Sequence, residues 1–184
     1  MANNFEQMKK IGKEGEAVVE TLLRNDDRVW GFEDVSEKDE WQGKDVDFLV
    51  LYESDDGSIE ERPIEVKTDK KAGRTRNFFV EARIFYKDEN KIPDEMKDKI
   101  KRLEDGRVYR DGWMLYSEAK YFFFYVPKDK KVYVIPKKEL KNFIIKNDSR
   151  RVPNYEGNKT VWGWLVPIND LCNNCNVTIY DVIQ

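Results

Sequence analysis

Acidic side chains and one lysine interrupt two short apolar stretches of the chain. Asp45 and Asp47 open the first stretch, and Glu65 and Lys67 lie within the second. Residues two apart on a strand point to the same side, so each pair shares a face if both stretches are strands. Charged groups on strands this apolar are costly to bury unless they are paired or bind a metal. The pattern therefore predicts a charged site between two strands.

The segment between the two stretches predicts how they pair. Asp55-Asp56-Gly57 is a turn signal, because its glycine can take a positive φ. A two-residue turn would place Asp47 on the wrong face. A three-residue loop places Asp47 opposite Glu65, about 4.5–5.5 Å away at Cβ, where one divalent cation can bridge both carboxylates. A longer loop, pairing that begins only after Pro63, and Asp45 in place of Asp47 remain the alternatives.

A glycine-containing helix adds a third part to this pattern. Residues 12–20 read Gly-Lys-Glu-Gly-Glu-Ala-Val-Val-Glu and carry Glu16. The order of helix Glu16, strand Asp47, turn, and strand Glu65-x-Lys67 resembles the signature of the PD-(D/E)XK nuclease superfamily. The resemblance covers residues 1–85, and it departs from the signature in one place, because a valine rather than a proline precedes the aspartate.

The resemblance implies a fold and a reaction. The fold is α/β and restriction-endonuclease-like, with a central mixed β-sheet flanked by helices on both faces. The reaction is metal-dependent hydrolysis of phosphodiester bonds, most of all in DNA. The alternative is a module of the same fold that binds nucleic acid or protein, with weak or no catalysis.

The resemblance also implies roles for individual residues. Asp47, Glu65 and the Val66 carbonyl would hold Mg²⁺ or Mn²⁺, since both cations prefer oxygen ligands. Glu16 would complete this cation site or a second one. Lys67 would orient the attacking water or stabilise the charge of the transition state.

Composition and charge agree with such chemistry. The chain has 184 residues and no histidine, which excludes Ser-His-Asp, Cys-His and histidine–metal sites. Its net charge is −3, but residues 1–66 carry −11 and residues 67–151 carry +10. An acidic part that binds cations beside a basic part that binds phosphates suits a nuclease.

A basic segment directly follows the second stretch, and it indicates the partner. Five of the ten residues 67–76 are lysine or arginine, and we interpret Lys70, Lys71, Arg74 and Arg76 as phosphate contacts. DNA is therefore the expected partner, with a homodimer left open. The first ten residues contain no apolar signal segment, and no apolar run is long enough to span a bilayer. We therefore expect a cytoplasmic protein without a membrane partner.

The length predicts a single domain over residues 1–184. Its core is expected in 1–86 and 112–146, with a charged excursion at 87–111 that could face the substrate and a closing segment at 147–184. Gly12 and Gly15 are expected to let the first helix approach the sheet closely. Helices are predicted from Asn3 or Asn4 to about Asn25 and at 137–146. Strands are predicted at 28–35, 45–51, 64–68, 78–85, 121–126, 132–135, 161–166 and 177–180. Polar loops are predicted at 36–43 and 147–159.

Cys172 and Cys175 have the spacing of a zinc-binding pair. A structural zinc site needs about four cysteine or histidine ligands, and the chain has no other cysteine and no histidine. We therefore expect plain reduced cysteines, with a redox pair as the alternative.

Overall fold

A long amphipathic helix, α1 (Ala2–Asn25), opens the chain. The computed structural model describes residues 2–182, except for the side chains of residues 2–5, 42 and 95. Val19 and Leu23, four residues apart on α1, are both buried. The predicted end of this helix at Asn25 is confirmed, whereas the expected cap is wrong, because the helix begins at Ala2 and Asn3 and Asn4 lie inside it.

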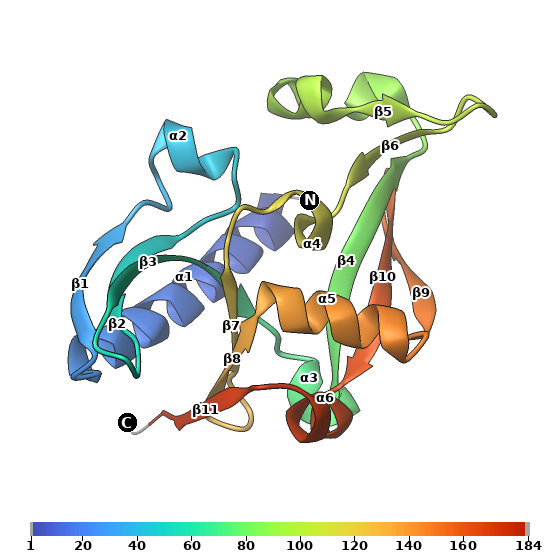
Figure 1. The fold of residues 1–184 in the computed structure, drawn as a ribbon. Coiled ribbons are helices and arrows are strands. Elements are labelled where there is room, and N and C mark those ends of the chain that lie inside the picture. Colours follow the sequence, from blue (N-terminus) through green and yellow to red (C-terminus); the bar gives the residue numbers. More distant parts are fainter. Residues whose placement is uncertain (1, 183–184) are drawn as a thin grey trace.

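The central sheet has six strands in the order β1-β2-β3-β7-β8-β11 (Figure 1). β3 and β7 run parallel, and the other neighbouring strands are antiparallel. The α/β class and the central mixed sheet are thus confirmed. The strands are β1 (Val29–Asp34), β2 (Phe48–Glu53), β3 (Ile59–Thr68), β7 (Tyr121–Val126), β8 (Lys131–Pro136) and β11 (Thr178–Asp181).

The hairpin between β2 and β3 has the predicted register. Phe48 pairs with Ile64 at the end of the ladder, and the same register carried one step further places Asp47 opposite Glu65. Gly57 closes the loop with a φ of +80°. The three-residue loop is therefore confirmed.

The ends of this hairpin differ from expectation in two ways. Pro63 lies inside β3 opposite Leu49, so pairing does not begin only after this proline. Its carbonyl accepts a hydrogen bond from the backbone N–H of Lys120, so its nitrogen faces the edge where β7 has not yet begun and no donor is missed. β2 begins at Phe48 rather than at Asp45, because Asp45 takes a left-handed φ of +55° that turns the chain out of the strand.

A second, antiparallel sheet was not predicted. It has five strands in the order β5-β6-β4-β10-β9. The expected polar loop at 147–159 is wrong over β9, which contains Pro153 and tolerates it as an edge strand. The charged excursion folds into two short 3₁₀ helices and into β5 and β6. The strands are β4 (Asn77–Tyr86), β5 (Lys101–Arg102), β6 (Val108–Asp111), β9 (Arg151–Glu156) and β10 (Lys159–Pro167).

Short helices connect the strands. The helix predicted at 137–146 is confirmed as α5, with Leu140, Phe143 and Ile144 buried. The expected loop at 36–43 contains the one-turn helix α2, and α6 was not predicted. The remaining helices are α2 (Asp39–Gln42), α3 (Ala72–Thr75), η1 (Glu89–Lys91), η2 (Asp94–Lys99), α4 (Trp113–Tyr116), α5 (Lys137–Lys146) and α6 (Ile168–Asn174).

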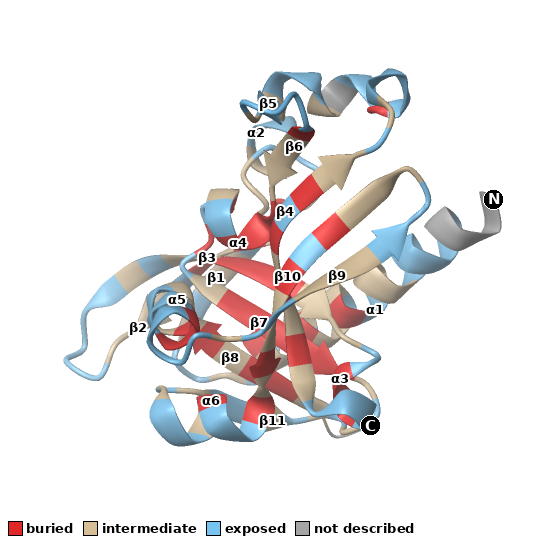
Figure 2. Ribbon diagram, turned by 90° about the vertical axis from the view of Figure 1, so that its right-hand side faces the viewer, coloured by how far each residue is buried: buried red, intermediate tan, exposed pale blue. Residues whose placement is uncertain are grey.

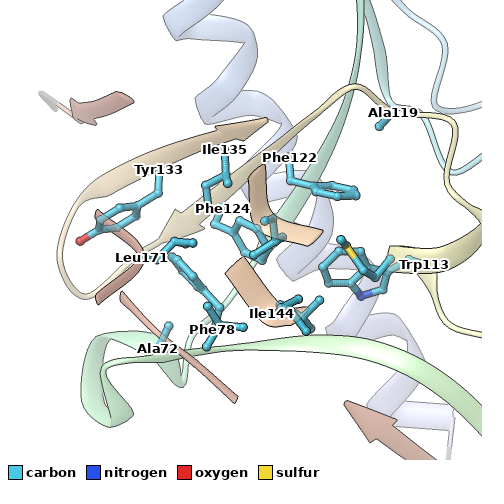
Figure 3. Close-up of a cluster of buried hydrophobic side chains, with 14 of the residues drawn as sticks. Ala72, Phe78, Trp113, Ala119, Phe122, Phe124, Tyr133, Ile135, Ile144 and Leu171 are labelled. Carbon is cyan, nitrogen blue, oxygen red and sulfur yellow. The ribbon is translucent and has the colours of Figure 1, made fainter. Parts of the chain in front are cut away.

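Apolar side chains fill both faces of the central sheet. On one face, Val19 and Leu23 of α1 pack with Phe48 and Ile64. The second sheet covers the other face together with α4, α5 and α6, and Figure 2 shows the buried residues concentrated along the strands between these layers. There the rings of Phe78 and Phe124 stack 4.3 Å apart, and Trp113 meets Phe122 at 4.8 Å (Figure 3). Helices thus lie on both faces, but strands supply much of the second cover.

Gly112 lies where α4 begins against β4, and its replacement tests this contact. A Cβ there would lie 2.7 Å from the backbone carbon and oxygen of Glu81. Backbone atoms cannot swing aside, so we expect Gly112→Ala to lower the free energy of unfolding by about 1–3 kcal/mol in urea denaturation. Gly43→Ala is the matched control, because nothing lies within 4 Å of the added atom. Equal stability of the two variants would show that α4 is free to shift.

Candidate active site

Close packing of α1 on β3 brings Glu16 to the sheet. A Cβ on Gly15 would lie 2.0 Å from Oγ1 of Thr68, so only glycine allows this approach. Gly12 makes no such contact, since its nearest neighbour is the Glu16 side chain at 3.8 Å. The expected close approach is therefore confirmed for one glycine of the two.

Asp47 is held by three hydrogen bonds at the start of β2. Its backbone N–H donates to the Ile64 carbonyl, and its own carbonyl accepts from the N–H of Val35, both at 2.8 Å. The Val66 N–H donates to its carboxylate Oδ2 at 2.7 Å. The side chain is thus fixed beside β3 before any ligand binds.

The Val66 carbonyl lies on the same edge of β3 as this carboxylate. The N–H and C=O of one strand residue point to the same edge of the strand, and the Val66 N–H points to Asp47. β2 begins only at Phe48, so the ladder does not continue over this carbonyl. Its predicted place among the cation ligands agrees with this direction.

Glu65 and Lys67 lie together on the face turned towards α4. The Lys67 ammonium donates to Oε1 of Glu65 and, at 3.3 Å, to Oδ2 of Asp45. It also lies 5.3 Å from the centre of the Trp113 ring. Glu65 is only 4% exposed, and its second oxygen, Oε2, is buried without a hydrogen-bond partner among the described residues.

Burial and crowding change the acidity of these groups. Burial raises the pKa of Asp47 to about 6, against the opposing effects of the Val66 N–H and the Lys67 charge. Burial likewise raises the pKa of Glu65, and the charges of Asp45 and Asp47 add to this effect. Burial lowers the pKa of Lys67, but the surrounding carboxylates, Glu65 first, outweigh it and raise that pKa well above its usual value. The site therefore holds a charged lysine and an excess of carboxylates.

Glu16 stands at the border of this group. Its negative charge is among the causes that raise the pKa of Asp47, so the two side chains belong to one electrostatic site. Its Oε2 pairs with the Lys13 ammonium at 2.9 Å, and its side chain is 19% exposed. It is therefore partly neutralised from the solvent side.

The residues fit an oxygen-liganded divalent cation, but they are not arranged as a finished site. Among the described residues, no three acidic, cysteine or histidine side chains are grouped closely enough to hold a metal. Lys67 instead pairs with two of the carboxylates. The buried, unpartnered Oε2 of Glu65 is an acceptor that a cation would satisfy. Cation binding at this place has to compete with the Lys67 ion pair.

The four predicted phosphate contacts lie on and beside α3, and two of them have acidic partners. The Lys70 ammonium lies 3.6 Å from Oε2 of Glu14, and Nη1 of Arg76 lies 2.5 Å from Oδ2 of Asp129. Lys71 and Arg74 are exposed, without a carboxylate within 4.0 Å among the described side chains. Lys71 and Arg74 are thus the stronger candidates of the group.

The two cysteines lie at the end of the chain's last helix, where Cys172 lines a hollow together with Arg76. Cys172 is on α6 and Cys175 follows it, and both are free thiols. Burial raises the pKa of each thiol, which disfavours the reactive thiolate.

Two residues of the site, Tyr116 and Ser117, carried no signal in the sequence, whereas a third, Glu81, stands out as a charged residue in the middle of the predicted strand 78–85. The Tyr116 hydroxyl donates to Oδ1 of Asp45 at 3.3 Å, and the Ser117 hydroxyl donates to the Asp45 carbonyl at 3.0 Å. Burial raises the pKa of Tyr116 to about 12, helped by the charge of Asp45. Glu81 on β4 is near enough for the charge of Lys67 to oppose the rise that burial causes in its pKa.

A hollow of 430 Å³ opens elsewhere, between the end of α1 and strands β8 and β11. Leu23, Arg62 and Tyr180 line it, and none of Glu16, Asp47, Glu65 or Lys67 does. We place the chemistry at the carboxylates, because the buried charges lie there.

Comparison with known proteins leaves the chemistry of the site as the guide to function. No family model, no curated protein and no solved structure matches the chain. Within residues 2–182, no helix is long and apolar enough to cross a membrane.

Proposed function

We propose that this protein is a metal-dependent nuclease of restriction-endonuclease-like type that hydrolyses phosphodiester bonds in DNA. The observation that carries the proposal is the meeting of Asp47, Glu65 and Lys67 at one point of the sheet, where Oε2 of Glu65 is buried and has no hydrogen-bond partner in the described part of the chain. The order of opening helix, hairpin and parallel strand supports the fold assignment.

The residues divide into cation ligands and a donor. Asp47, Glu65 and the Val66 carbonyl would hold Mg²⁺ or Mn²⁺, with Glu16 as a further ligand. When bound, such a cation supplies Lewis acidity and a nucleophilic water at neutral pH. The Lys67 ammonium can turn from Glu65 to a phosphate oxygen, where its hydrogens would stabilise developing negative charge.

The ion pair of Lys67 with Glu65 and Asp45 also favours a second candidate function. A lysine that already neutralises the carboxylates leaves less need for a cation. The chain would then be a binding module of the same fold for nucleic acid or protein, with weak or no catalysis.

Cleavage and metal binding together separate the two functions. Labelled duplex DNA, single-stranded DNA and RNA are incubated with the protein and Mg²⁺, Mn²⁺ or a chelator. We expect cleavage of DNA with either cation and none with the chelator. Calorimetric titration of both cations, with and without DNA, runs alongside. A protein that binds neither cation, even with DNA present, is the binding module instead.

A further inference from the structure

A positively charged hollow of 230 Å³ lies beside the carboxylates. Its basic residues come from the excursion, at η2, β5 and β6. Figure 1 shows β5 and β6 above α4, at the upper end of β4, whereas α3 lies at its lower end. The hollow is lined by Gly43, Lys99, Lys101, Arg110, Asp111 and Tyr116.

Lys99 faces this hollow without an acidic partner among the described side chains. Its ammonium donates to the Gly43 carbonyl at 3.2 Å and lies 5.3 Å from the centre of the Tyr116 ring. An ammonium group has three hydrogens to donate, so donors remain for an anion. Several other basic residues of the excursion have acidic partners, as Nη2 of Arg102 has in Oε2 of Glu89 at 2.7 Å.

Arg110 is the second cation lining this hollow that has no carboxylate within 4.0 Å among the described side chains. Its Nε donates to the Tyr86 hydroxyl at 3.2 Å, and its Nη1 donates to the Asp111 carbonyl at 3.3 Å. The guanidinium carbon lies 5.9 Å from the centre of the Tyr116 ring. Neutral groups make its direct contacts, and the charge of Glu81 acts on it without forming an ion pair within 4.0 Å. A guanidinium held in this way keeps its positive charge and can bind a phosphate.

Tyr116 connects this pair of cations to the candidate active site. Its ring lies against both Lys99 and Arg110, and its hydroxyl donates to Asp45. Asp45 in turn accepts from Lys67. The two cations are therefore built into the wall of the carboxylate site, whereas Lys101 beside them is neutralised by Asp111 at 2.5 Å.

We propose that Lys99 and Arg110 form a phosphate subsite that holds the nucleic-acid backbone next to the phosphodiester bound at Asp47 and Glu65. The position of the subsite relative to the reacting bond rests on the proposed function, whereas the binding of the phosphate does not. The subsite gives the excursion a function as the wall that positions the strand, and it reads no base, since phosphate contacts carry no sequence information.

The test measures the binding of a short fluorescent duplex by anisotropy in a chelator, over a series of salt concentrations. Lys99→Gln with Arg110→Gln is compared with Arg102→Gln with Arg107→Gln. The control pair removes the same charge from the same excursion, but its residues are exposed and already paired with Glu89 and Asp105. We expect the Lys99 and Arg110 pair of changes to weaken binding about tenfold and to reduce the slope of log affinity against log salt concentration by about 2. The control pair should have smaller effects on both the affinity and this slope.

Two further measurements separate loss of the subsite from misfolding of the double variant and from failure of the proposed function. Arg110 is partly buried, so Lys99→Gln alone, which keeps Arg110, should show about half of the loss in salt slope if the double variant does not fold. Metal affinity measured by calorimetry should be unchanged in all variants. Equal effects of the test and control pairs, or no effect of either, would overturn the subsite. Absent metal binding in the unmodified protein would instead overturn the nuclease assignment and leave the subsite standing.

Discussion

Glu65→Gln is expected to reduce DNA cleavage about 10²–10³-fold, equivalent to about 3–4 kcal/mol of transition-state stabilisation. The amide keeps the size of the side chain but removes the negative charge that faces a cation. Metal affinity should fall with activity, because the buried Oε2 has no other partner in the described structure. Cleavage rates at saturating Mg²⁺ or Mn²⁺ and calorimetric titration of the same samples measure both effects.

Lys67→Met separates binding from chemistry at the same site. The ammonium pairs with Glu65 and Asp45, so its removal should strengthen metal binding, because a competing positive charge is gone. Cleavage should nevertheless fall about 10²–10³-fold, since the cationic donor is lost. Lys120→Met is the control, because this lysine is exposed and its ammonium donates to a backbone carbonyl, that of Glu61, rather than to a carboxylate.

The pattern across variants assigns the ligands. If Glu65→Gln keeps full metal affinity, this carboxylate is not a ligand. If Asp45→Asn loses the metal while Asp47→Asn keeps it, the left-handed turn at Asp45 delivers the ligand in place of Asp47. If Lys67→Met binds no metal, the lysine orders the carboxylates rather than competing with a cation.

The carboxylate hairpin was predictable because its information is local. The loop at 55–57 determines the register of β2 and β3, and the period of two then determines which side chains share a face. Asp47, Glu65 and Lys67 therefore came together as the sequence indicated. The turn at Asp45 was not predictable, because Ser117 and Tyr116, more than seventy residues away, hold it.

The second sheet depends on contacts that no local pattern contains. β4 pairs with β10 across about seventy residues of chain, and β10 pairs with the edge strand β9, which lies in the segment predicted as a polar loop. The excursion has a charged and polar sequence because most of its side chains are exposed, and three of its cations face a hollow rather than a core. Pairing between strands this far apart in the sequence is not encoded in any local residue pattern, so the second sheet could not be predicted.

Asp47→Asn is expected to stabilise the metal-free protein at pH 8 while it removes a cation ligand. Burial raises the pKa of Asp47 from 3.8 to about 6 in the folded state, so the ionised carboxylate is held at a cost that the unfolded chain does not bear. This reduction in the free energy of unfolding is absent below the unfolded pKa of 3.8. It grows as the pH rises from there to about 6, and it reaches its full size above pH 6. Its upper limit is about 3 kcal/mol. Asparagine carries no charge and keeps an oxygen that can accept from the Val66 N–H.

Urea denaturation in a chelator at pH 4 and pH 8 measures this effect. We expect Asp47→Asn to raise the free energy of unfolding by up to about 3 kcal/mol at pH 8 and by much less at pH 4. Asp56→Asn is the control, and it should lower rather than raise the free energy of unfolding at pH 8. Hydrogen bonds from Ser58 lower the pKa of this exposed carboxylate in the folded state. Saturating Mg²⁺ or Mn²⁺ should make the unmodified protein more stable than Asp47→Asn at pH 8, because the cation stabilises the unmodified protein and not the variant. A gain of the same size at both pH values would show that the charge of Asp47 is not its source, and an unchanged order with the cation would remove Asp47 from the ligands.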